Sequence, residues 1–214
     1  HTCGVRSDGT VACWGDNGSG QSTPPAGTFV QVSAGSQHTC GVRSDGTVAC
    51  WGDNWDGQST PPAATFTQVS AGRWHTCALR SDGTVACWGD NWHGQSTPPA
   101  GTFVQLSAGW YHTCALRSDG TVACWGNNDS GQSTRPADTF VQVSAGGRPE
   151  FDLGPVGAQH VCALRSDGTV ACWGWNNYGQ STPPAATFTQ VSAGRRHTCG
   201  VRSDGSVACW GEVP

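Results

Sequence analysis

Cysteine and histidine are the residue types in this chain whose spacing could support chemistry. Two thiols at a fixed spacing can either bind a metal or form a disulfide. No C-x-x-C motif is present, and each pair supplies only two ligands. We therefore predict disulfides for all six pairs, which are Cys3 with Cys13, Cys40 with Cys50, Cys77 with Cys87, Cys114 with Cys124, Cys162 with Cys172, and Cys199 with Cys209.

A histidine precedes the first cysteine of every pair by two positions. These residues are His1, His38, His75, His112, His160 and His197. Because the histidine occupies the same place in every repeat, we interpret it as structural and held by a hydrogen bond rather than as a metal ligand. Residues 53–57 (DNWDG) weakly resemble a calcium loop but lack its full set of carboxylates. We expect no metal and no cofactor.

Enzymatic signals are poor in this sequence. A catalytic centre needs a nucleophile, a base and an orienting acid that stand out in one place. Only two glutamates exist, Glu150 and Glu212, and the recurring serines and histidines occur in every repeat. We expect no enzymatic activity. A net charge of −4 and the absence of lysine argue against nucleic-acid binding, and no apolar run is long enough to span a membrane.

The cysteines are positioned by a β-hairpin, HTCGVRSDGTVACWG, at residues 1–15. TCGVR and TVACW alternate as strands do, and SDG suits a three-residue turn with Gly9 at positive φ. This register places Cys3 opposite Cys13 at a non-hydrogen-bonded pair, within disulfide distance.

The hairpin recurs from residues 1, 38, 75, 112, 160 and 197. A turn-rich connector, DNxxGQSTPPA, and a third strand, TFVQVSA, follow it, and no helical periodicity is present. Cys3 and the valines lie on one face of the hairpin, whereas Gly4 and Trp14 lie on the other. Gly4 is expected to leave space for an indole. Units that pack on both faces favour a β-propeller over a solenoid.

We predict one all-β propeller domain over residues 1–214, with about six short three-stranded blades and one disulfide per hairpin. No TFxQVSA segment precedes the first hairpin or follows the last, so the first blade should lack one strand. A seven-bladed or open ring is the alternative if upstream sequence is missing. The start at histidine and the absence of a signal peptide suggest a mature or excised product.

The WGDNxxGQ, VSAGxxH and DGTVACWG elements resemble the repeat of the regulator of chromosome condensation superfamily. The short unit with its WGDNxxGQSTPPA connector is most similar to the secreted type II β-lactamase-inhibitory proteins of soil bacteria. That resemblance implies a secreted propeller that binds an enzyme. The chain differs from these inhibitors in its disulfides, in having arginine for lysine, and in its repeat number.

Strand direction should place the AGxxH turns and the DNxxG connectors on one face, opposite the SDG turns. The two variable positions in each of these loops carry many aromatic and charged residues, which are enriched at binding hot spots. The predicted partner-binding residues at these positions are Trp55, Asp56, Arg73, Trp74, Trp92, His93, Trp110, Tyr111, Tyr178, Arg195 and Arg196. Trp175, which replaces the usual aspartate just before Asn177 and Tyr178, is predicted to join them. An insertion loop at about 147–159 adds Arg148 and Phe151 to the same face.

Three functions fit this sequence. The first is a secreted recognition propeller that binds a partner protein through its aromatic and arginine-rich loops. The second is a lectin-like module that stacks its tryptophans on sugar rings. The third is a disulfide-stapled subunit of an extracellular assembly or filament, joined through the incomplete first blade. Six disulfides predict an oxidising location, either secreted or at the cell surface.

Overall fold

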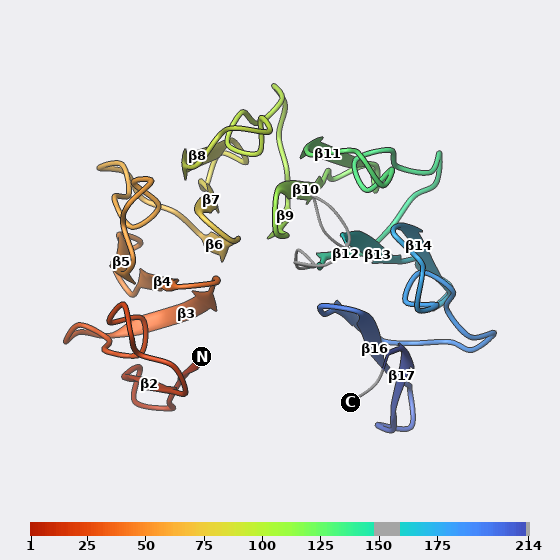
Figure 1. Ribbon diagram of the computed structural model, residues 1–214, viewed down its shortest axis with the longest axis horizontal. Helices are drawn as coiled ribbons and strands as arrows, with labels where there is room; N and C mark the ends of the chain where they lie inside the picture. Colours follow the sequence, from red (N-terminus) through yellow and green to blue (C-terminus); the bar gives the residue numbers. More distant parts are fainter. Residues whose placement is uncertain (148–158, 213–214) are drawn as a thin grey trace. The chain divides into compact units, whose positions relative to one another are not determined.

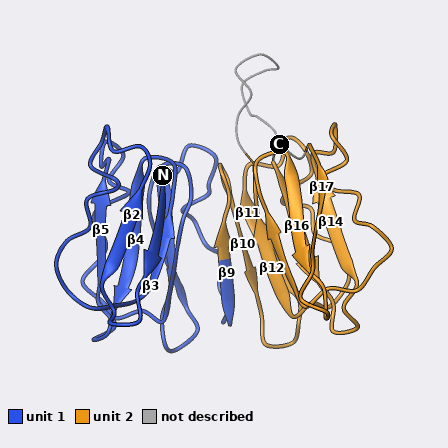
Figure 2. Ribbon diagram, turned by 90° about the horizontal axis from the view of Figure 1, so that it is seen from below, with its two compact units in different colours: residues 1–106 blue, residues 107–214 orange. Residues whose placement is uncertain are grey.

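The computed structural model describes residues 1–147 and 159–212. The chain divides into two compact units, His1–Leu106 and Ser107–Pro214 (Figure 2). Within the described residues every regular element is a β-strand. That part of the chain therefore contains no helix long and apolar enough to cross a membrane.

Unit 1 contains three antiparallel sheets, ordered β1-β2, β3-β4-β5 and β6-β7-β8 (Figure 1). The first sheet has only two strands, as the sequence predicts. The strands are β1 (Thr2–Val5), β2 (Val11–Trp14), β3 (Phe29–Ala34), β4 (His38–Arg43), β5 (Val48–Gly52), β6 (Gln68–Ala71), β7 (His75–Leu79) and β8 (Val85–Gly89).

Unit 2 contains the sheets β11-β10-β9, β12-β13-β14 and β15-β16-β17. Strand β9 (Gln105–Ala108) begins at the end of unit 1 and pairs with β10. The other strands are β10 (His112–Leu116), β11 (Val122–Gly126), β12 (Gln142–Ala145), β13 (His160–Leu164), β14 (Val170–Gly174), β15 (Gln190–Ala193), β16 (His197–Val201) and β17 (Val207–Gly211).

The hairpin register is the one predicted. Cys3 pairs with Cys13, and the Arg6 backbone N–H donates to the Thr10 carbonyl at 2.8 Å. Gly9 has a φ of 81°, which glycine adopts without strain. The Asp8 carboxylate accepts bonds from the hydroxyl and the backbone N–H of Thr10, and these bonds lower its pKa.

The six predicted disulfides are all formed, one in each hairpin. In every case the two cysteines face one another across the strand pair, with their Cα atoms 4.0–4.1 Å apart. The bonds join Cys3 to Cys13, Cys40 to Cys50, Cys77 to Cys87, Cys114 to Cys124, Cys162 to Cys172, and Cys199 to Cys209. The pairing inferred from spacing alone is therefore confirmed for all twelve cysteines, and none is free.

The core consists of contacts between successive sheets. In unit 1 the Cys40 and Val42 face of one sheet packs against Phe66, Val69 and Ala78 of the next. In unit 2 a corresponding cluster joins Cys162, Leu164 and Val170 to Phe188, Val191 and Trp210. In both clusters one sheet buries its cysteine and aliphatic face against a phenylalanine-containing face of the next sheet in the same unit.

One packing prediction is wrong where the third strand is present. The space beside the small hairpin residue is filled by phenylalanine, not by an indole. A Cβ added at Gly41 would lie 2.7 Å from Phe29 Cδ1, whereas the nearest atom at Gly4 is Trp14 Cη2, at 3.9 Å. The third strand supplies this phenylalanine from its own sheet, and Trp51 packs edge-on against Phe29 at 5.9 Å between ring centroids.

Neighbouring sheets are also joined by buried hydrogen bonds. The carbonyl of Gln21 accepts bonds from Trp51 Nε1 at 2.9 Å and from Thr39 Oγ1 at 3.1 Å. His1 Nε2 hydrogen-bonds to the same threonine hydroxyl at 2.7 Å. The bond between tryptophan and a glutamine carbonyl recurs from Trp88, Trp173 and Trp210. The repeated polar residues thus connect one sheet to the next.

Candidate binding surface

The variable loops are the two residues between AG and H in each turn and the two residues that precede the glycine in each DNxxG connector. Repeated side chains hold each connector in shape. The buried Gln58 accepts a bond from the Asp56 backbone N–H at 3.0 Å and donates to Asp53 Oδ2 at 2.9 Å. Asn54 Oδ1 accepts a bond from the Ser59 backbone N–H at 2.8 Å. The repeated residues make the internal contacts of this connector, and its variable residues Trp55 and Asp56 are exposed.

The connector tryptophans of unit 1 are the most exposed large hydrophobic side chains described. Trp55 is 91% exposed and Trp92 is 89% exposed. The scaffold tryptophans Trp51 and Trp210 are 8% and 9% exposed. At the repeated position Trp51, Trp125 and Trp210 are buried, whereas Trp14 of the two-stranded first sheet is 58% exposed. Trp55 and Trp92 are more exposed than any of these.

The structure brings turns and connectors of unit 1 together in one pocket of about 420 Å³. Its lining residues come from two connectors and two AGxxH turns, and they are Ser19, Gln37, Asp53, Trp55, Asp56 and Trp74. In unit 1, therefore, the two kinds of loop open onto the same side. Arg73 stacks its guanidinium over the Trp74 ring, 3.5 Å from the centroid.

The remaining predicted residue of unit 1, His93, is half-buried beside Trp92. Its backbone N–H donates to Gln95 Oε1 at 2.9 Å, as the equivalent residues do in the other connectors. Of the predicted residues in unit 1, the pocket includes Trp55, Asp56 and Trp74, while Trp92 and His93 lie on the next connector.

In unit 2 the structure gathers a second group. The Trp175 and Tyr178 rings meet edge-on at 5.2 Å, and the Arg196 guanidinium lies 4.8 Å from the Tyr178 centroid. Arg196 also forms an ion pair with Glu212 at 2.8 Å. Tyr178 is 37% exposed, and Arg195 beside this group is exposed.

Trp175 is the first residue of its connector. The other connectors begin with aspartate, except one that begins with Asn127. The buried Gln180 consequently has no acceptor for its Nε2 group among the described residues. An orphaned buried amide destabilises a fold. The sequence departs here from its own repeat pattern and places a half-buried aromatic residue where the other repeats have a polar one.

The expectation that Tyr111 lies at the surface is wrong. Tyr111 is only 7% exposed, and its backbone N–H donates to Gln159 Oε1 at 3.0 Å. Its side chain is packed in the interior. The adjacent Trp110 is half-buried. Arg148 and Phe151 of the predicted insertion lie outside the described residues.

The polar part of the unit 1 pocket was not among the predicted partner-binding residues. Ser19 and Gln37 occupy variable positions of the predicted loop face but are neither aromatic nor charged, and Asp53 is a repeated residue. The available signal was that Ser19 and Gln37 hold the positions that Asp56 and Trp74 hold in the next repeat.

Four of the repeated histidines, His1, His38, His112 and His160, make side-chain hydrogen bonds within the structure. His38 is buried and hydrogen-bonds through Nε2 to Thr76 Oγ1 at 2.8 Å, and His160 bonds in the same way to Thr198. His112 differs because Val161 replaces the usual threonine, and its Nδ1 bonds to Gln159 Oε1 at 2.9 Å instead. Burial lowers the pKa of His38 and of His112 to about 4. The described residues contain no group of three or more His, Cys, Asp or Glu side chains suited to a metal ion.

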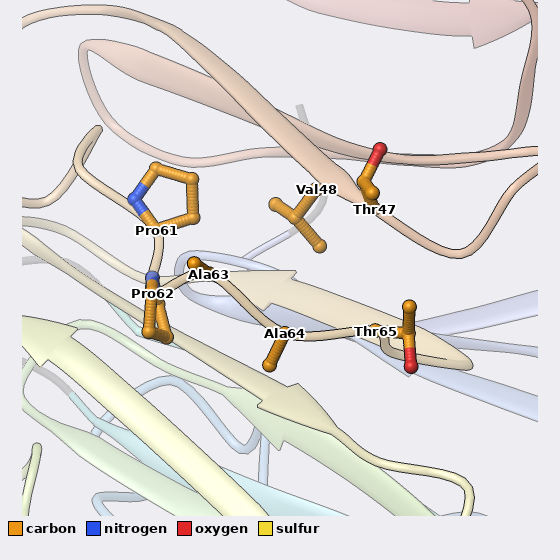
Figure 3. Close-up of a pocket in the computed structure, with 7 residues that line it drawn as sticks. All are labelled: Thr47, Val48, Pro61, Pro62, Ala63, Ala64 and Thr65. Atoms are coloured by element: carbon orange, nitrogen blue, oxygen red, sulfur yellow. The ribbon is translucent and has the colours of Figure 1, made fainter.

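A larger pocket of about 580 Å³ lies elsewhere in unit 1 (Figure 3). It is lined by Thr47, Val48, Pro61, Pro62, Ala63, Ala64 and Thr65. These residues belong to the repeated PPA segment and to the start of β5. They do not include a variable loop, so the pocket near Trp55 is the better candidate site.

Comparison with known proteins identifies the repeat. The model of the regulator of chromosome condensation (RCC1) repeat matches residues 1–21, 29–58, 66–95, 103–132, 156–180 and 188–212. No curated protein sequence matches the chain significantly.

Among solved structures, the chain is similar to the ectodomain of the receptor kinase CR4 from Physcomitrella patens. The identity is 27%, the TM-score is 0.81, and the match covers 98% of this chain and 59% of that ectodomain. The ectodomain of ACR4 from Arabidopsis thaliana gives 28% identity and a TM-score of 0.78 over 99% of this chain and 77% of that one. Prp20p from Saccharomyces cerevisiae gives 20% identity and a TM-score of 0.69, over 87% and 57% of the two chains. Together with the six small antiparallel sheets, these matches confirm the predicted propeller fold.

Proposed function

Because the chain belongs to the regulator of chromosome condensation (RCC1) repeat family, we propose that it is an extracellular recognition propeller that binds a partner protein through its variable loops. The observation that carries this proposal is that Trp55 and Trp92 are almost fully exposed, whereas the scaffold tryptophans Trp51, Trp125 and Trp210 are buried. Exposed tryptophan on a rigid scaffold loses little entropy on binding and buries a large area.

Two further observations support it. Six disulfides and similarity to receptor ectodomains support an extracellular location, either secreted or at the cell surface. Yeast RCC1 (Prp20), a protein of this fold, has been crystallised bound to Kap60, so the fold is compatible with a protein partner. Many of the repeated histidines, serines and aspartates make structural hydrogen bonds, among them Asp8, His38 and Ser59, which supports a role without catalysis.

The experiment compares capture of extracellular proteins by the wild-type chain and two variants. The loop variant carries Trp55→Ala and Trp92→Ala, and the control variant carries Ser81→Ala and Ser203→Ala in exposed SDG turns. We expect a partner to bind the wild type and the control but not the loop variant. Identical capture by all three proteins would contradict the proposal.

The partner class is a finer prediction, based on the resemblance to type II β-lactamase-inhibitory proteins. A panel of purified β-lactamases, each titrated with the chain, tests it. Nanomolar or micromolar inhibition that is lost in the loop variant supports it. Full enzyme activity at micromolar chain removes this partner class and leaves the broader proposal in place.

Two other functions have an observation in their favour. Trp55 and Trp74 beside Ser19 and Gln37 offer the aromatic and polar groups that a lectin-like site needs. Signals on a glycan array that disappear with Trp55→Ala would favour this function.

The two-stranded first sheet leaves the edge of β1 without the third strand of other sheets, which would suit an assembly subunit. A constant monomer mass by light scattering would exclude that role.

A further inference from the structure

The pocket in unit 1 that contains Trp55 combines an open aromatic surface with carboxylates. Within the described residues, Trp55 makes no ring or cation contact of the kind that Trp74 and Tyr178 make, and both faces of its indole are accessible. The Asp56 carboxylate lies beside it in the same pocket and is exposed. It has no hydrogen-bond or ion-pair partner in the part of the chain that the structure describes.

The negative charge around Asp56 is reinforced by its neighbours. Desolvation raises the pKa of Asp56, and the carboxylates of Asp90 and Asp53 raise it further. The charge of Asp53 is not compensated by its hydrogen bond, because its Oδ2 accepts that bond from the neutral Gln58 amide. A neutral ligand would leave this repulsion unchanged, whereas a cation would relieve it.

Other aromatic residues of the variable loops already bind guanidinium groups. Arg73 lies over Trp74, which is itself part of the pocket, and Arg196 lies over Tyr178 in unit 2. Such contacts arise because the face of an aromatic ring is electronegative. Trp55 lies in a connector of unit 1 beside the unpaired Asp56 carboxylate, but no arginine of the described chain lies over its ring.

We propose that this pocket receives one cationic side chain, an arginine or a lysine, of the partner protein. The cation lies against the Trp55 indole and pairs with Asp56, while Gln37 and Ser19 offer acceptors for its remaining N–H groups. This inference rests on the proposed function and names the chemistry that the variable loops recognise.

The next connector provides a matched control within the same unit. Trp92 is as exposed as Trp55, but His93 stands where Asp56 stands in the preceding repeat. An effect that requires only an exposed indole will appear at both tryptophans. An effect that requires the indole and the carboxylate together will appear at Trp55 alone.

The test is an NMR titration that follows the indole N–H signals of the ¹⁵N-labelled full chain. The probes are N-acetyl-arginine amide, N-acetyl-lysine amide, the neutral N-acetyl-citrulline amide, and methyl α-glucoside. Trp55→Ala and Trp92→Ala assign the two exposed signals. We expect both cationic probes to shift the Trp55 indole N–H signal with millimolar affinity. Whichever of the arginine and lysine probes gives the larger shift identifies the side chain that the pocket prefers.

Asp56→Asn keeps the shape of the side chain and removes its charge. We expect it to weaken binding of the cationic probes by about twofold to fivefold, the range of one exposed ion pair or cation–π contact. Trp55→Ala should abolish the saturable response at neighbouring backbone signals, and Trp92→Ala should leave the affinity unchanged. The unaltered signals of the buried tryptophans report that each variant is folded.

Two results would overturn the inference. One is a Trp55 shift as large with the citrulline probe or the glucoside as with arginine, and the other is no saturable shift with any probe. Neither result affects the proposed function, which is judged by capture with the loop variant. Conversely, a cationic probe that binds while all variants capture the same proteins would refute the proposed function and leave the pocket chemistry intact.

Discussion

Lowering the pH from 7 to 5 should destabilise both units, because buried histidines are held neutral in the folded state. Burial lowers the pKa of His38 and His112 from 6.5 to about 4 and that of His160 to about 3. Asp53 partly opposes the shift at His38, and the Gln159 bond does so at His112. At His160 the neighbours His112 and His197 add to it.

The sign follows from proton linkage. Below pH 6.5 the unfolded chain takes up protons that these folded histidines do not, so stability is lost as the pH falls from 6.5 toward 4. Between pH 7 and pH 5 each histidine accounts for about 2 kcal/mol. The loss is therefore about 2 kcal/mol in unit 1, from His38, and about 4 kcal/mol in unit 2, from His112 and His160.

Urea unfolding at pH 7, 6 and 5, with disulfides intact, measures this loss. His38→Gln should lower stability at pH 7 but reduce the pH dependence by about one proton, since one titrating group is removed. The SDG aspartates do not confuse the result, because their pKa lies below the usual value of 3.8 and their contribution is lost only at lower pH. Equal unfolding midpoints at pH 7 and pH 5 would refute the reasoning.

Three further changes test the packing by urea or thermal unfolding. Thr76→Val removes the hydrogen bond to the buried His38 and should lower the free energy of unfolding by about 1–3 kcal/mol. The control is Thr102→Val, at an exposed position without a hydrogen bond among the described residues. It should change the free energy of unfolding by less than about 0.5 kcal/mol. Gly52→Ala should lower the free energy of unfolding by at least about 3 kcal/mol, because the φ of Gly52 is 96° and the new Cβ would lie 2.6 Å from the Gln37 carbonyl oxygen. Gly57 also has a positive φ but open space around it, so Gly57→Ala should lower that free energy by only about 1 kcal/mol. Val161→Thr should stabilise unit 2 by about 0.5–1 kcal/mol, because the buried His112 Nε2 lacks a partner among the described residues; unchanged or lower stability would contradict this assignment.

The scaffold could be predicted from the sequence because its determinants are local. A strand pattern of period two, a turn glycine and two cysteines at fixed spacing define the hairpin register without reference to any other part of the chain. The structure confirms this register, in which Cys3 pairs with Cys13. It also confirms the six disulfides and the two-stranded first sheet. Repetition then extends one correct hairpin to all six.

Side-chain environment depended on tertiary structure. The sequence places Trp55 and Tyr111 alike at variable positions, yet one is in solvent and the other is packed beside Gln159. Phenylalanine rather than indole fills the space at Gly41, because the third strand of the sheet adds a side chain that the hairpin pattern does not contain.

The candidate site shows the same division. The sequence by itself determined which loops vary and that they carry aromatic and charged residues. Only the tertiary structure placed Gln37 and Trp74 from two turns beside Ser19 and Asp56 from two connectors, and only it left the Asp56 carboxylate without a partner in the described chain. The physical reason is that strand register is set by neighbours along the chain, whereas a pocket and its charge depend on side chains from different sheets that meet only when those sheets pack.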